Sequence, residues 1–124
     1  MWTYRCYNDS SAPNLWRNWY DNNPDYQGSH DSVFGMLEQQ DQWREPHAKI
    51  LDKNNGIIEV RLTGIVRHRV LGFYGSVRRE FIVVATCHHK GEVYTPKNIR
   101  KTAAERRKRI EADIGEAPSC ERPY

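Results

Sequence analysis

The sequence contains little cysteine, and no cysteine pair at metal-binding spacing. Its three cysteines, Cys6, Cys87 and Cys120, are odd in number and far apart. Neither a disulfide framework nor a CxxC metal motif is therefore visible. We expect three reduced thiols and a protein that resides in a reducing compartment.

Long apolar runs are also missing. No stretch approaches the roughly 20 apolar residues that a membrane-spanning helix needs. The first ten residues, MWTYRCYNDS, lack the basic segment and apolar stretch of a signal peptide. These absences predict a cytoplasmic protein with no membrane partner.

The chain has the length and composition of one small globular domain. Its 124 residues allow one modest core. Hydrophobic residues make up 38% and charged residues 28%, which is not the composition of a disordered protein. We predict a single domain over residues 1–115 and a frayed tail over 116–124, where two prolines occur.

Positive charge is concentrated in the second half of the chain. Residues 1–56 hold five Lys or Arg and eight Asp or Glu, a net −3, whereas residues 57–124 hold fourteen and eight, a net +6. A basic half suits a polyanionic partner such as a nucleic acid. The alternative interpretation is a basic helix that is merely solvated.

The order of predicted elements is β-α-α-β-β-β-α. Alternation and turn signals predict strands at residues 3–7, 57–62, 66–74 and 80–87. Apolar residues at helical spacing predict helices from about residue 10 to 22, 29 to 43 and 96 to 114, with Gly115 after the last one. Short connections favour antiparallel hairpins. The sequence therefore predicts an α+β fold, a small antiparallel sheet with helices packed on one face.

Period-two alternation places several arginines on one face of that sheet. Arg61 lies on the opposite side of its strand from the apolar residues, and Arg67 and Arg69 share one face of the next strand. Arg61 and one of the other two can therefore converge on the helix-free face. The arginine guanidinium can donate two parallel hydrogen bonds to one phosphate. Solvated surface arginines are the alternative.

Two histidines and a lysine end the last predicted strand. His88 and His89 face opposite ways, so one of them can join the arginines. Histidine transfers protons near neutral pH, and Lys90 adds positive charge. Tyr94 follows shortly after. A zinc site from Cys87 and the two histidines is a weaker alternative, because adjacent residues rarely chelate one ion.

The last predicted helix is strongly basic. Its cations surround an isoleucine stripe rather than interrupt it, which suits nonspecific attraction to phosphates. A solvated helix face and a protein contact are the alternatives. The cations are Lys97, Arg100, Lys101, Arg106, Arg107, Lys108 and Arg109.

These segments together resemble the RelE/ParE superfamily of toxins, and most closely its phage-derived, HigB-like branch. The likeness covers about residues 29–110. It rests on the E-x-R of Glu59–Arg61, the strand 69–75, the hydrophobic strand 80–84, Lys90, Pro96 and the A-x-x-R of residues 103–106. The resemblance implies a two-layer α+β fold and a type II toxin neutralised by an antitoxin, often a helix-turn-helix protein.

For the RelE-like and HigB-like members, the resemblance also implies mRNA cleavage, commonly on the ribosome. The RNA's own 2′-hydroxyl attacks the adjacent phosphate, and no metal or other cofactor is needed. Arg61 and Arg69 would contact the phosphate, and His89, or secondly His88, would be the acid or base. Lys90 would stabilise charge and Tyr94 would stack on a base or orient the phosphate. Further RNA contacts would come from Arg67, Lys97, Arg100, Lys101 and Arg107.

Two other functions stay open on the sequence. ParE-like members of the same fold inhibit DNA gyrase and cut nothing, so a noncatalytic toxin with a protein target is one alternative. A phage module that binds RNA or protein without killing is the other.

Overall fold

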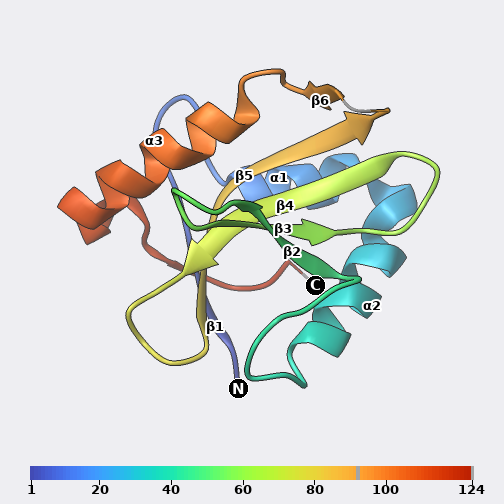
Figure 1. The fold of residues 1–124 in the computed structure, drawn as a ribbon, viewed down its shortest axis with the longest axis horizontal. Coiled ribbons are helices and arrows are strands. Elements are labelled where there is room, and N and C mark those ends of the chain that lie inside the picture. Colours follow the sequence, from blue (N-terminus) through green and yellow to red (C-terminus); the bar gives the residue numbers. More distant parts are fainter. Residues whose placement is uncertain (92, 124) are drawn as a thin grey trace.

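The computed structural model describes residues 1–91 and 93–123 of an α+β protein with a mixed, mostly antiparallel open sheet (Figure 1). The helices in this described part are α1 (Leu15–Asn22), α2 (Gln27–Leu37) and α3 (Ile99–Ala112), with short 3-10 turns at Pro24–Tyr26 and Ile114–Glu116. The strands are β1 (Thr3–Cys6), β2 (Ala48–Asp52), β3 (Ile57–Arg61), β4 (Arg67–Tyr74), β5 (Glu80–Lys90), β6 (Val93–Thr95) and β7 (Ser119–Cys120). Among the described residues, none of the helices has the length and apolar character to cross a membrane.

The sheet order is β2-β3-β4-β5-β1-β7, and β6 pairs with the end of β5. The first strand lies beside the fifth and parallel to it, while the other described pairs are antiparallel. β5 is therefore a central strand. Its nearly continuous apolar run fits that position, because both of its faces are buried.

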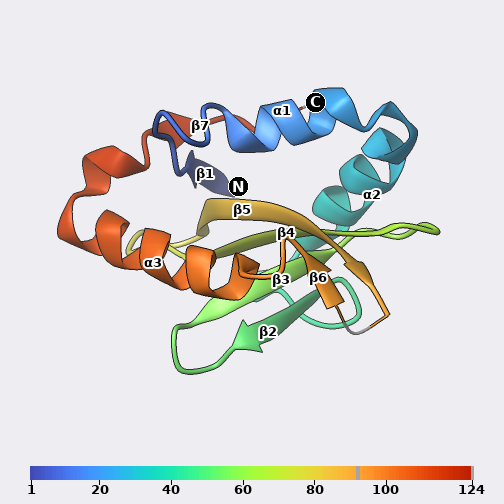
Figure 2. The ribbon, with the colours of Figure 1, turned by 90° about the horizontal axis from the view of Figure 1, so that it is seen from above.

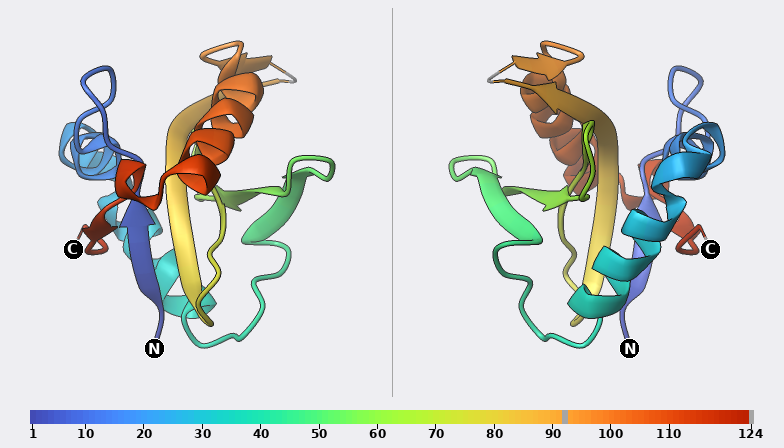
Figure 3. Two further views of the ribbon diagram at one scale, coloured as in Figure 1. Left: turned by 90° about the vertical axis from the view of Figure 1, so that its left-hand side faces the viewer. Right: turned by 90° about the vertical axis from the view of Figure 1, so that its right-hand side faces the viewer.

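Helices cover both faces of the sheet, so the prediction of helices on one face is wrong. On one side, Phe81 and Val83 of β5 pack with α1 and α2 around Trp16 and Phe34. On the other side, Ile82 and its neighbours on β5 pack against α3. Figure 3 shows β5 between α1 and α3, and Figure 2 shows the same layers from above. The apolar stripe of α3 needs a surface of its own, since the aromatic residues of α1 and α2 fill the first face.

Several element bounds differ from the sequence prediction. α2 ends at Leu37, because Trp43 leaves the helical path and packs against Trp2 and Phe81, with ring centroids 4.5 and 4.6 Å apart. α3 begins at Ile99 rather than Pro96, since Thr95 belongs to β6 and pairs with His88. Strands β2, β6 and β7 were not predicted. The last helix ends before Gly115, which lies in a 3-10 turn.

The cysteine and tail predictions need the clearest correction. Cys6 and Cys120 form a disulfide that joins β1 to β7, and Cys87 is the free thiol. The tail is not frayed at this point, because Ser119 and Cys120 pair with β1 and Arg122 forms an ion pair with Glu38. Two cysteines 114 positions apart carry no local spacing signal, so sequence reasoning could not pair them.

Candidate functional site

A cavity of about 450 Å³ opens on the α3 side of the sheet, beside the N-terminal end of α3. Strands β2 to β6 and the first turn of α3 supply its walls, and most of its lining is charged. The lining residues are Lys49, Ile50, Leu51, Glu59, Arg61, Arg67, Arg69, His89, Tyr94 and Arg100. Five cationic side chains thus surround one carboxylate, which favours an anionic ligand.

Sheet register brings the strand residues of the cavity together. Arg61 on β3 faces Arg69 on β4, and Arg67 on β4 faces His89 on β5. His89 in turn faces Tyr94 on β6. Antiparallel partners point to the same face of a sheet, so four strands present these groups to one space. The sequence predicts that Arg61 converges with Arg67 or Arg69 on a helix-free face. All three arginines line the cavity, but the face is not free of helices, because α3 packs on it.

Glu59 is the buried centre of the cavity. Its side chain accepts a 2.8 Å hydrogen bond from Arg61 Nε at Oε1 and a 2.6 Å bond from the Tyr94 hydroxyl at Oε2. Arg69 Nε lies 4.0 Å from Oε2. The residue is 3% exposed. Both carboxylate oxygens are therefore engaged, and Glu59 orients a cation and a phenol around it.

Arg69 is buried and incompletely bonded. Its Nη1 donates to the His68 carbonyl oxygen at 3.0 Å, but its Nε has no hydrogen-bond partner among the described residues. Burial lowers the pKa of Arg69 from its ordinary value, and the negative charge of Glu59 opposes that change. A buried donor without an acceptor is costly, so this side chain is suited to an added anionic acceptor.

His89 and Tyr94 form a stacked pair, with ring centroids 4.5 Å apart and planes 25° from parallel. Burial and the bond to Glu59 raise the pKa of Tyr94, so its hydroxyl stays a donor at neutral pH. The stack covers one face of the Tyr94 ring. Tyr94 therefore holds His89 in place, and that ring face is not open to a base.

His88 lies on the opposite face of β5. Its ring is 6.0 Å from that of His68, which accepts a 3.2 Å hydrogen bond from the Trp19 indole. It is therefore among the α1-side residues, away from the cavity. Cys87 shares the face of Arg69, but burial raises the pKa of its thiol to about 12. Cys87, His88 and His89 thus do not converge, and the described residues contain no group of three or more metal-ligating side chains.

Most of the remaining predicted residues do not line the cavity. Lys90 ends β5 and is exposed, as are Lys97 before α3 and Lys101 on it. Arg100 does line the cavity, where it donates a 2.7 Å bond to the Leu51 carbonyl. Arg107 instead donates to the carbonyls of Asn55 and Gly56 in the β2–β3 turn. Arg107 therefore stabilises this turn in addition to adding positive charge.

Sequence reasoning missed Glu59 and Lys49 as site residues. Glu59 had a usable signal, because alternation puts it on the same strand face as Arg61. Lys49 lies on β2, an edge strand whose alternation is too weak to have been predicted. No signal in the chain indicated that this strand closes the cavity.

No protein-family model matches the chain, and neither a curated protein nor a solved structure is significantly similar to it. The likeness to RelE/ParE toxins therefore depends on the residues described above.

Proposed function

We propose that the cavity binds an RNA phosphate and that the protein cleaves RNA without a metal. The observation that carries this proposal is the convergence of Arg61, Arg67, Arg69 and His89 on one cavity. Cations stabilise the charge of a phosphorane, and histidine transfers protons near neutral pH. A substrate that brings its own nucleophile, the 2′-hydroxyl, needs little else from the protein.

In the proposed step, His89 takes the proton of the 2′-hydroxyl as the 2′ oxygen bonds to phosphorus. The bond between phosphorus and the 5′ oxygen breaks, and that oxygen takes a proton from water. The products are a 2′,3′-cyclic phosphate and a 5′-hydroxyl end. Arg61 and Arg69 would bind the nonbridging oxygens, and Arg67 would attract the strand at the exposed rim.

The wider role that we propose is that of a toxin in a type II toxin–antitoxin pair. Its target would be mRNA, at the ribosome, and its partner a small antitoxin of the helix-turn-helix kind. The support is the resemblance to RelE/ParE toxins, a likeness whose E-x-R and following strands supply Arg61 and Arg69. Exposed Lys97 and Lys101, before and on α3, suit the phosphate backbone of such a target.

One observation favours a second candidate, an RNA-binding module that does not cut. Both oxygens of Glu59 are engaged by Arg61 and Tyr94, so His89 is left as the proton-transfer group of the cavity. Binding alone needs the cations and no second acid or base. A noncatalytic toxin with a protein target, such as gyrase, has no comparable support in the cavity.

Induced expression in cells tests the proposal. Primer extension on cellular mRNA soon after induction is expected to show new cuts with wild type and none with His89→Gln. His88→Gln is the matched control, since it removes the neighbouring histidine on the other sheet face. Growth arrest without cuts would favour a protein target. RNA binding without cuts or arrest would favour the binding module.

A further inference from the structure

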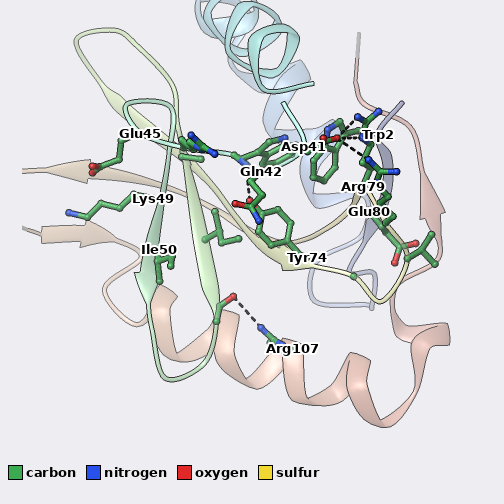
Figure 4. A pocket seen from close by; sticks show the side chains of 18 of the residues that line it. Trp2, Asp41, Gln42, Glu45, Lys49, Ile50, Tyr74, Arg79, Glu80 and Arg107 are labelled. Carbon is green, nitrogen blue, oxygen red and sulfur yellow. Dashed lines mark hydrogen bonds and ion pairs between the residues drawn. The ribbon is translucent and has the colours of Figure 1, made fainter. Parts of the chain in front are cut away.

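A second hollow, a groove of about 1120 Å³, is lined in part by edge strand β2 (Figure 4). The loop 41–45, β2 and the β4–β5 connection form its walls. In Figure 4 the Tyr74 ring lies in the middle, with Lys49 and Glu45 toward one end and Asp41 and Arg79 toward the other. The proposed cleavage step does not use this groove.

Apolar surface is exposed along this groove. Tyr74 is 39% exposed, and Ile50 and Val77 are each 60% exposed. Trp2 and Trp43 contribute at its inner wall. Exposed side chains of this size gathered in one hollow indicate a binding surface.

The Tyr74 side chain is fixed in position although its ring is partly exposed. Its hydroxyl accepts a 3.1 Å hydrogen bond from the Trp43 backbone N–H. Its ring lies 6.0 Å from Trp2, 6.2 Å from Trp43 and 6.3 Å from Phe81, centroid to centroid. A fixed aromatic ring loses little entropy when a flat ligand stacks on it.

The groove also carries an excess of positive charge. Its six cations are Arg44, Lys49, Lys53, Arg78, Arg79 and Arg107, against three carboxylates. Each carboxylate is already near an arginine: Asp41 bonds to Arg79, Glu80 lies 3.3 Å from Arg5, and Glu45 lies 3.9 Å from Arg61. The charge of the groove therefore complements a polyanion.

Two features connect the groove with the cavity. Lys49 and Ile50 line both hollows from β2. The ion pair between Glu45 and Arg61 also joins a groove residue to a cavity residue. A strand bound in the cavity can thus pass over β2 and continue into the groove.

We infer that this groove is a nucleobase subsite for single-stranded RNA, with one base stacked on Tyr74 and the adjoining phosphates near Lys49 and Lys53. The inference rests on the proposed function of the cavity. Basic grooves with aromatic platforms are how proteins hold single strands without reading their sequence. The substrate class is accordingly an unpaired strand, since a paired base has no free face to stack.

Fluorescence anisotropy with 2′-O-methyl oligouridines tests the subsite, because these strands lack the nucleophile and cannot be cut. A dinucleotide occupies the cavity, and an octanucleotide reaches the groove as well. We expect Tyr74→Leu to weaken octanucleotide binding about tenfold and to leave dinucleotide binding within about twofold of wild type. Tyr74→Phe, which keeps the ring, should bind the octanucleotide as wild type does.

Tyr26→Leu is the matched control. The Tyr26 hydroxyl also accepts a backbone hydrogen bond, from Val66 N–H at 3.0 Å, but the residue lies outside the groove. An equal loss in both leucine variants would overturn the subsite, as would a wild type that binds the two strands equally. A poly-glutamate peptide that binds the groove as tightly as the octanucleotide would also overturn it. No binding of either strand by wild type would overturn the proposed function itself.

Discussion

The Tyr94 hydroxyl donates a 2.6 Å hydrogen bond to Glu59 Oε2 from a strand that follows Glu59 by 35 positions. This bond fixes β6 at the cavity. The ring of the same Tyr94 stacks on the ring of His89. Tyr94 joins a buried carboxylate to the proposed acid–base group through one side chain. The geometry of His89 therefore depends on Glu59.

Glu59→Gln is expected to destabilise the fold by about 3–5 kcal/mol, because it leaves Arg61 and buried Arg69 without their carboxylate. Urea denaturation measures the loss. Glu45→Gln is the control, since its carboxylate also faces Arg61, at 3.9 Å, but is 64% exposed. That variant should cost less than about 1 kcal/mol. Equal effects of the two substitutions would contradict the central place of Glu59.

Stability is expected to fall with acid before the carboxylates titrate. His30 accepts a 3.0 Å bond from the Trp16 indole, and His68 accepts one from Trp19. Burial lowers the pKa of both histidines below the ordinary 6.5, so the unfolded chain binds these protons more readily than the folded one. The stability is fully present above about pH 6.5 and is lost as pH falls toward the lower folded-state values.

Thermal unfolding measured across this range checks the histidine prediction. His30→Gln keeps an acceptor for Trp16 but does not titrate, so its unfolding temperature should depend less on pH than that of wild type. An unchanged slope in this variant would assign the acid sensitivity to other groups.

Reduction of the Cys6–Cys120 disulfide is expected to lower the free energy of unfolding by about 4 kcal/mol, since the bond closes a loop of 114 positions. Urea unfolding with and without dithiothreitol measures this difference. In the Cys6→Ser/Cys120→Ser variant, the reductant should have no effect. A wild type that is equally stable in both states would show that β7 is held by its other contacts.

Arg67→Gln is expected to weaken RNA binding with little effect on folding, because Arg67 is an exposed residue of the cavity rim. The slope of log K against log salt should decrease by about one. Lys108→Gln, an exposed change on α3 away from the cavity, is the control. A similar decrease in both variants would indicate diffuse attraction rather than a phosphate site.

The strands with strong alternation carried most of the correct prediction. Alternation along β3 and β4 put Arg67 and Arg69 on one face and allowed Arg61 to converge with either of them. Along β5 it indicated only that one of His88 and His89 could join the arginines, and in the structure this residue is His89. That rule needs no knowledge of which strands are neighbours in space. It therefore predicted which side chains of β3 and β4 share the cavity, but not that β2 forms part of the cavity wall.

Long-range contacts account for what the sequence did not reveal. Trp43 ends α2 early because it packs on Trp2, far away in sequence, and no helical pattern encodes that contact. The disulfide and the short strand β7 depend on the C-terminal segment reaching β1. The covering of both sheet faces follows from the size of the aromatic core on one side, which a strand pattern alone does not give.

Cleavage of a defined substrate by purified protein tests the central claim most directly. The substrate is a DNA oligonucleotide with one internal ribonucleotide, incubated in the presence of EDTA, and mass spectrometry identifies the ends. We predict a single cut after the ribonucleotide, with a 2′,3′-cyclic phosphate and a 5′-hydroxyl, from wild type and His88→Gln but not from His89→Gln. A cut that His89→Gln still makes, or 5′-phosphate ends, would contradict the account, as would a substrate that stays intact both alone and when ribosomes are added without EDTA.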